Sequence, residues 1–308
     1  MKKILLATTA IVAFAGAASA EIKLSGFAEM GVDGGNGPGV GGEEQFHNDI
    51  SITFSAAGET DGGLSFGVKA QIDNSNGVNP NGPTVWDDEA VFISGAFGKL
   101  TLGETDGALD WALSEIYAGS AINDDHSTHS GGYFNSGLDS IYDNQIARYE
   151  YSFGDFAFGA SAELDDAGPG DTNWAVGAKW AGDLAGTAVG VGVAYQSNNV
   201  YDIFGATVSA TLASGFTANA EYIDLDGFGG YDDWIGAAVG YVSGPLLVQA
   251  NYGVFSQVVG SDVDGYGVVV NYDLGGGVVA MAGYGSGDGP AGNGAGDETW
   301  SVGLGLSF

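Results

Sequence analysis

Apolar and polar residues alternate along most of this chain with a period of two. In the segment GLSFGVKAQID the apolar residues fall on one face, at Leu64, Phe66, Val68, Ala70 and Ile72. The final segment ETWSVGLGLSF has the same pattern, at Trp300, Val302, Leu304, Leu306 and Phe308. The intervening residues are small, polar or charged. Such alternation is typical of β-strands with one apolar face.

The alternation predicts sixteen strands, separated by turn residues. They cover residues 22–33, 46–57, 63–73, 88–97, 99–104, 145–153, 155–164, 172–181, 186–196, 200–213, 215–224, 231–243, 245–255, 264–273, 277–285 and 297–308. Short connections alternate with mostly longer ones, and acidic residues gather in the longer ones. We therefore expect an up-and-down antiparallel sheet whose two ends face different surroundings.

A soluble β-protein and a membrane barrel both show this alternation. The strand lengths lie near the ~9–11 residues that cross a bilayer at a tilt. Aromatic residues cluster at strand ends, as in membrane-interface girdles, at Trp174, Trp180, Tyr195, Tyr222, Tyr241, Tyr252, Trp300 and Phe308. The pattern favours an all-β, transmembrane, antiparallel up-and-down β-barrel of about 16 strands. Its first and last strands must pair, because an open edge is unfavourable in lipid.

The first twenty residues resemble a secretory signal peptide rather than part of the fold. Lys2 and Lys3 precede an apolar run, and Ala18-Ser19-Ala20 is a small-residue cleavage motif. We expect cleavage between Ala20 and Glu21. Residues 21–308 would then form a single barrel domain.

Composition narrows the class of protein further. The chain has 56 Gly and no Cys, which excludes a disulfide-stapled scaffold. Its formal charge is −32, or −34 without Lys2 and Lys3, with 39 acidic residues against five remaining basic ones. Such a surface repels nucleic acid and favours cations as solutes.

One segment departs from the period of two. In ALDWALSEIYA, residues 108–118, the apolar residues follow helical spacing, at Leu109, Ala112, Leu113, Ile116 and Tyr117. This segment lies in the longest connection, about residues 104–145. A barrel of about sixteen strands leaves an aqueous lumen. We expect this loop to fold inside, with its apolar face on the wall and its acids in the water.

The segment AVFISGAFGKLTLGETDGALDWALSEIYAG resembles the fourth strand, fifth strand and constriction loop of general diffusion porins of the bacterial outer membrane. The nearest resemblance is to those of photosynthetic purple bacteria. EIKLSGFAEMGV, YDLGGGVVAMAGY and the Phe-terminated last strand resemble the same group. The resemblance implies a homotrimer in outer-membrane lipid and lipopolysaccharide, and passive diffusion of small hydrophilic solutes. It also implies calcium near the loop, at Glu104, Asp106 and Asp110.

The resemblance assigns charged residues to the constriction. The expected acids are Glu104, Asp106, Asp110, Glu115, Asp124 and Asp125. The expected basic wall is sparse, consisting of Lys69, Arg148, Lys179, Lys23 and Lys99. Strand phase places Lys69 and Arg148 toward the lumen, with the other three nearer the short-turn rim. So few basic residues favour a pore that prefers cations.

Other motifs carry little chemistry. Ser65 in GLSFG lies inside a strand rather than on a nucleophile elbow, so we expect no catalysed reaction. The DDHSTH segment, residues 124–129, is expected to be a solvated acidic loop rather than a metal site. Two alternatives to a general porin stay open at this point. One is a substrate-specific porin with a lumenal binding site, and the other is a soluble secreted β-protein or adhesin.

Overall fold

A computed structural model describes residues 21–36, 44–73, 85–117, 119–122, 136–165, 171–287 and 297–308. The strands are β1 (Glu21–Gly35), β2 (Gln45–Glu59), β3 (Ser65–Asp73), β4 (Val85–Gly95), β5 (Gly98–Gly103), β6 (Ile146–Phe153), β7 (Phe156–Glu163), β8 (Asn173–Leu184), β9 (Thr187–Ser197), β10 (Asp202–Leu212), β11 (Phe216–Asp224), β12 (Tyr231–Ser243), β13 (Leu246–Gln257), β14 (Val263–Gly275), β15 (Val278–Gly287) and β16 (Asp297–Ser307). One short helix, α1 (Ala108–Ala112), and one 3₁₀ turn, η1 (Phe228–Gly230), complete the described elements. No helix in these ranges is long and apolar enough to cross a membrane.

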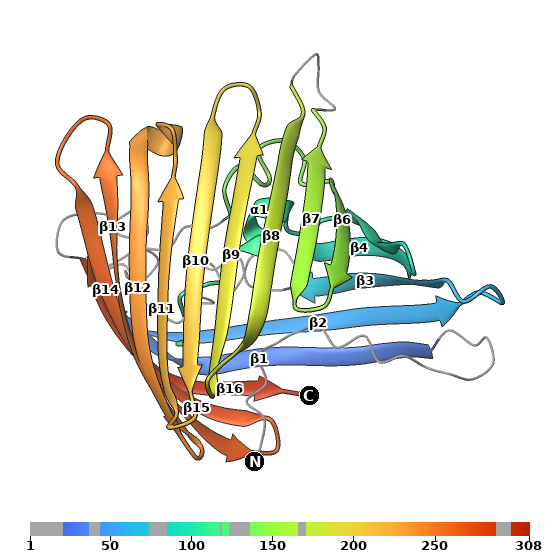
Figure 1. Cartoon of the computed structure of the whole chain (residues 1–308). Helices are drawn as coiled ribbons and strands as arrows, with labels where there is room; N and C mark the ends of the chain where they lie inside the picture. Colours follow the sequence, from blue (N-terminus) through green and yellow to red (C-terminus); the bar gives the residue numbers. More distant parts are fainter. Residues whose placement is uncertain are drawn as a thin grey trace.

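The sixteen strands form one closed antiparallel barrel (Figure 1). Each strand pairs with its neighbours in sequence, and β16 pairs with β1 from Phe27–Ser307 to Gly35–Thr299. Gly26 and Phe308 extend this seam, because the Gly26 N–H donates to the Phe308 carbonyl at 2.8 Å and the Phe308 N–H donates to the Gly26 carbonyl at 3.0 Å. The predicted strand number and the predicted pairing of first with last strand are confirmed.

The strands are strongly tilted. In Figure 1, β8 to β12 run steeply, whereas β1 to β3 lie across them on another wall. Strands in barrels tilt by roughly 35–45° from the axis, so strands on opposite walls cross at about twice that angle. A sixteen-stranded barrel with this tilt is wide enough to enclose water as well as a folded loop.

The outer face of the barrel is apolar. The alternating positions on β16 point outward as the sequence predicts, and Val302 and Phe308 are 52% and 70% exposed. Thr299 and Ser301 between them are 5% and 3% exposed and face the interior. Aromatic rings meet on the outer surface near strand ends, for example Trp174 with Tyr195 at 5.5 Å between centroids. An apolar outer face with aromatic ends is the arrangement that lipid requires.

The interior of the barrel has two unlike halves. We define the apolar half as the inner faces of β8 to β13. Its buried apolar side chains are Ala175, Ala194, Ile203, Ile223, Trp234, Ala238 and Phe255, and buried polar side chains such as Gln196, Glu221 and Gln249 lie among them. We define the polar half as the inner faces of β1 to β6. It carries charged side chains that include Glu29, Asp33, Lys69, Asp87, Lys99, Arg148 and Glu150.

The helix is shorter than the sequence predicts. It ends at Ala112 rather than near residue 118, and Leu113 is already extended. Side chains of the wall bind the backbone groups beyond this point, since the Ser114 N–H donates to Thr207 Oγ1 at 3.1 Å. The predicted burial is nevertheless correct, because Leu109, Ala112, Leu113, Ile116 and Tyr117 are all at most 9% exposed.

Candidate functional site

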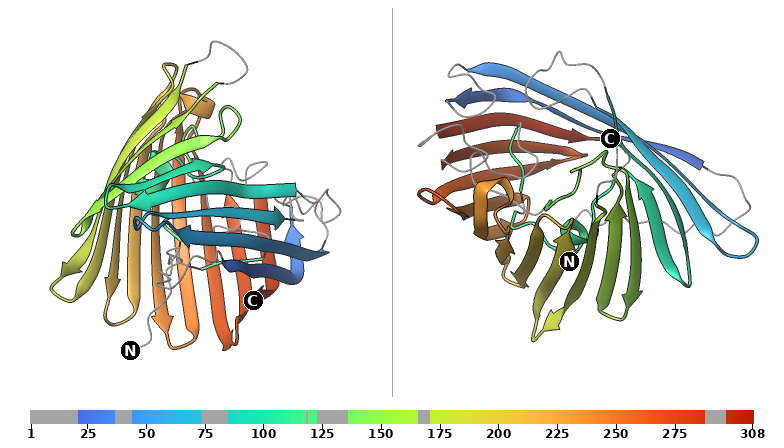
Figure 2. Two further views of the ribbon diagram at one scale, coloured as in Figure 1. Left: turned by 90° about the vertical axis from the view of Figure 1, so that its right-hand side faces the viewer. Right: turned by 90° about the horizontal axis from the view of Figure 1, so that it is seen from above.

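The inward loop follows β5 and contacts β7 before it packs against the apolar half. The Ala108 N–H donates to Ser161 Oγ of β7 at 2.8 Å. Helix α1 then lies against β8 and β9 inside the barrel, as the view from above in Figure 2 shows. Gly177 of β8 allows this close approach, because a Cβ there would lie 2.4 Å from the Ala108 carbonyl oxygen. Glycine on the wall therefore makes room for the helix.

Beyond the helix, the loop follows the inner wall across several strands. The Ile116 carbonyl accepts hydrogen bonds from Asn219 of β11 and Gln249 of β13, at 2.8 and 3.0 Å. The Ser120 N–H donates to Asn271 Oδ1 of β14 at 2.9 Å. The backbone of the loop is thus held by amide side chains of the wall, while Ile116 itself is fully buried.

The returning segment of the loop is also anchored on the wall. The Leu138 N–H donates to Gln196 Oε1 at 2.7 Å, and its carbonyl accepts from Asn173 Nδ2 at 2.8 Å. Glu163, at 1% exposed, accepts the Asn144 N–H at 2.9 Å. The wall residues Gln196, Asn173 and Glu163 are almost completely buried, so they act as fixed attachment points.

Asp139 connects the two ends of the inward loop. Its carboxylate accepts the Gly107 N–H at 2.6 Å and the Gln196 side-chain amide at 2.8 Å. Burial raises the pKa of Asp139 to about 6, and the nearby charges of Asp106 and Glu163 act in the same direction. The two hydrogen bonds lower its pKa, but burial has the larger effect.

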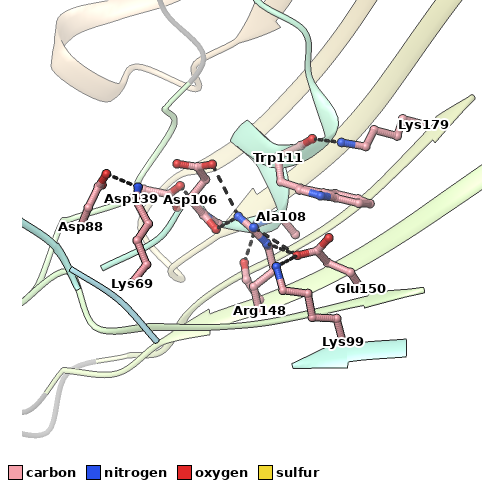
Figure 3. A network of polar contacts seen from close by, with 12 residues as sticks. Lys69, Asp88, Lys99, Asp106, Ala108, Trp111, Asp139, Arg148, Glu150 and Lys179 are labelled. Atoms are coloured by element: carbon pink, nitrogen blue, oxygen red, sulfur yellow. Dashed lines mark hydrogen bonds and ion pairs between the residues drawn. The ribbon is translucent and has the colours of Figure 1, made fainter. Parts of the chain in front are cut away.

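Three basic residues of the polar half, Arg148, Lys99 and Lys69, are paired with acids (Figure 3). The Arg148 side chain is 8% exposed, and its Nε and Nη2 lie 3.2 and 3.1 Å from Glu150 Oε1. Its Nη1 donates to the Asp106 carbonyl and lies 3.6 Å from the Asp106 carboxylate. Lys99 Nζ lies 3.7 Å from the same Glu150 oxygen. Glu150 therefore joins two cations on one wall.

The other basic residues are placed differently. Lys69 forms an ion pair with Asp88 and remains 46% exposed. Lys179 donates to the Trp111 carbonyl at 2.7 Å, and its Nζ lies 4.0 Å from the centre of the Trp111 ring. Lys179 thus supports α1 from the wall of β8, a contact that the sequence did not predict. Lys23 lies near the start of β1, in the register row that continues through Ser55 to Lys69.

The expected acids are divided among several roles. Glu104 accepts the Asp88 N–H at 3.1 Å and the Asn144 side-chain amide at 2.6 Å. Asp106 is 64% exposed beside Arg148, Asp110 lies in the first turn of α1, and Glu115 is exposed. Asp124, Asp125 and Ala20 lie outside the described residues, as do residues 126–129 of the DDHSTH segment, and Glu21 is the first residue of β1.

The calcium site implied by the resemblance does not fit these contacts. The Glu104 carboxylate already accepts hydrogen bonds on both oxygens, and Asp106 lies beside a guanidinium cation. In the described part of the chain, no group of three or more His, Cys, Asp or Glu side chains is placed to hold a metal ion. A calcium ion shared by Glu104, Asp106 and Asp110 would require a different arrangement.

Sequence reasoning missed Asp88, Asp139 and Glu150. Glu150 had a usable signal, because it lies two residues from Arg148 and therefore on the same face of β6. Asp88 and Asp139 had none. Their contacts depend on a local irregularity in β4 and on how the loop returns to the wall.

The comparisons with known proteins agree with this architecture. A family model described as Gram-negative porin matches residues 7–292. A porin of Rhodobacter capsulatus is 33% identical over 156 residues, which cover 50% of this chain and 48% of that protein. The match therefore spans about half the length of that relative.

Solved porin structures have the same fold. A porin structure refined at 1.8 Å has a TM-score of 0.72 and 25% identity, covering 94% of this chain and 100% of the other. A mutant of the Rh. blastica porin has a TM-score of 0.71 with 19% identity, over the same shares of the two chains. With a family match over most of its length, a closed barrel and a loop packed inside it, the chain belongs to the Gram-negative porin family.

Proposed function

We propose that this protein is a passive, water-filled channel of the bacterial outer membrane that admits small hydrophilic solutes and ions and prefers cations. Family membership and the sixteen-stranded barrel support the channel. An apolar outer face and a charged inner face support its place in a membrane. A channel of this kind needs no catalytic residue, since solutes diffuse through it.

The charge balance of the lumen carries the cation preference. All five basic residues after residue 20 belong to the described chain, and Lys69, Lys99 and Arg148 each lie beside a carboxylate. The inward loop between residues 104 and 145 adds acids but no Lys or Arg. A passing ion therefore meets an excess of negative charge, which raises the local concentration of cations.

The proposal includes partners and processing. We infer a homotrimer in contact with outer-membrane lipid and lipopolysaccharide, and removal of residues 1–20 by cleavage between Ala20 and Glu21. The resemblance to porins supports the trimer. Mass spectrometry of the protein from outer membranes would test the cleavage site, and cross-linking in detergent would test the trimer.

Single-channel recording in a planar bilayer tests the proposed function. Under a KCl gradient we expect stepwise conductance that rises with salt concentration, and a reversal potential that favours potassium. A reversal potential favouring chloride would contradict the cation preference. Absence of channels from correctly folded, heat-modifiable protein would contradict the function itself.

A further inference from the structure

Strand β4 carries a bulge at the edge of the pore. Lys69 of β3 pairs with Ala90, whereas Gln71, two residues on, pairs with Asp87. The bulged strand thus has one extra residue, and Asp88 within it has a φ of 58°. A left-handed backbone is unfavourable for a residue other than glycine. Bulges often redirect a side chain beside a functional site, and this one directs Asp88 onto Lys69.

The base of the inward loop holds this bulge in place. Glu104 Oε2 accepts the Asp88 N–H at 3.1 Å, and the Glu104 N–H donates to the Glu89 carbonyl at 2.8 Å. Asn144, at the returning end of the loop, donates to the other Glu104 oxygen at 2.6 Å. Gly103 is required beside the bulge, because its φ is 139° and a Cβ there would lie 2.1 Å from the Glu89 carbonyl oxygen.

Among the basic side chains in the described ion pairs, that of Lys69 is the most exposed. Its side chain is 46% exposed, compared with 29% for Lys99 and 8% for Arg148. Asp88 beside it is 43% exposed (Figure 3). A passing ion therefore approaches Lys69 and Asp88 together. An exposed pair of this kind contributes little to stability, so its main effect is on the field in the pore.

We propose that Asp88 is a specificity-determining residue of this channel and that Glu104 is the residue that positions it. Asp88 offsets the charge of Lys69, the most exposed of the basic side chains in the described ion pairs, and so shifts the selectivity of the pore toward cations. The inference rests on the proposed function only in requiring that the protein conducts ions. Its test compares shifts between variants, so it does not depend on the absolute selectivity of the native channel.

The test measures reversal potentials of D88N, K69Q and the double variant in planar bilayers. D88N exposes the Lys69 charge and should lower the potassium-to-chloride permeability ratio by about two- to five-fold at low salt. K69Q should raise this ratio by a similar factor, and the double variant should return close to the native value. D61N makes the same charge change in an exposed short turn, and should leave the ratio unchanged.

A second pair of variants tests Glu104. E104Q and E104A remove the same charge, but only E104Q keeps a side-chain acceptor for the Asp88 N–H. We expect E104A to shift selectivity further toward that of D88N and to increase current noise.

Several outcomes would overturn the proposal. An unchanged ratio in D88N, or shifts of D88N and K69Q in the same direction, would exclude Asp88 as a determinant. Heat-modifiable gel mobility shows whether D88N assembles. If it does not, an unchanged permeability ratio in K69Q would exclude Asp88 as a determinant. Equal ratios and equal noise in E104Q and E104A would remove the positioning role of Glu104. A native protein that does not conduct would end both this inference and the proposed function, whereas a native preference for chloride would contradict only the latter.

Discussion

The apolar and polar halves of the barrel interior hold the inward loop by different physical means. On the apolar half, the loop buries Leu109 and Ile116 completely, against a wall of aliphatic and aromatic side chains. On the polar half, the base of the loop contacts the wall through charges, as where Arg148 meets Asp106. Burial of apolar surface stabilises strongly and is not screened by salt. Charge pairs in contact with water are weaker, and dissolved salt screens them.

This difference separates two properties of the molecule. Changes on the apolar half should alter the stability of the docked loop and leave ion selectivity nearly unchanged. Changes on the polar half should alter selectivity more than stability. Four predictions follow in order of decreasing effect, and the first two test this separation directly.

The largest effect is expected from I116A on the apolar half. Truncation of a fully buried isoleucine should lower the free energy of unfolding by about 2–5 kcal/mol, because it leaves a cavity between loop and wall. Chemical unfolding in detergent micelles would measure this loss. I235A removes the same atoms from the 53% exposed outer face of β12 and should cost less. A large change in reversal potential in I116A would contradict the proposal that the apolar half affects stability and not selectivity.

R148Q should have an intermediate effect on stability and a clear effect on selectivity. It leaves Glu150 and Asp106 without their shared guanidinium, and should cost about 1–3 kcal/mol. The potassium-to-chloride ratio should rise by about two- to five-fold. R148K keeps the charge but not the forked geometry, so it should retain selectivity and lose stability. Unchanged stability in R148K would show that charge, rather than the forked geometry of the guanidinium, holds the base of the loop.

Acidification should produce a smaller effect through Asp139. Its pKa of about 6 exceeds the ordinary value of 3.8, so the folded protein takes up a proton at this site as pH falls from 7 to 5. Cation preference should decrease over this range, because one negative charge is lost. The contribution of Asp139 to the free energy of unfolding has the opposite trend and increases as pH falls. It is complete below pH 3.8 and is lost as pH rises through about 6. Reversal potentials at several pH values should show this step in native protein and not in D139N.

Removal of calcium should have the smallest effect. Because the contacts of Glu104 and Asp106 do not fit a shared calcium ion, a chelator should leave the unfolding midpoint and the conductance unchanged. A fall in the midpoint that calcium restores and magnesium does not would show that these carboxylates rearrange around the ion.

The sequence predicts the barrel well because its signal is local. Lipid on one side and small or polar groups on the other impose a period of two on most strands, so these strands can be recognised separately. The buried face of the loop is visible for the same reason, in the spacing of Leu109, Leu113 and Ile116.

The pairing of charges could not be predicted in the same way. The contact between Arg148 and Asp106 depends on the path of the loop, and that between Lys69 and Asp88 on one extra residue in β4. The early end of α1 depends on Thr207, almost one hundred residues further along the chain, which takes the Ser114 N–H. Alternation along one strand contains no information about these distant partners.

The hydrogen bonds on the Ile116 carbonyl also imply an order of assembly. Its donors, Asn219 and Gln249, lie 103 and 133 residues further along the chain. Contacts of such long sequence separation form slowly, since the intervening chain must first lose much of its freedom. The wall that binds the loop is incomplete until β13 and β14 have joined the sheet. Refolding should therefore show a late phase in which the loop docks inside a nearly complete barrel. The pore becomes narrow only at that step.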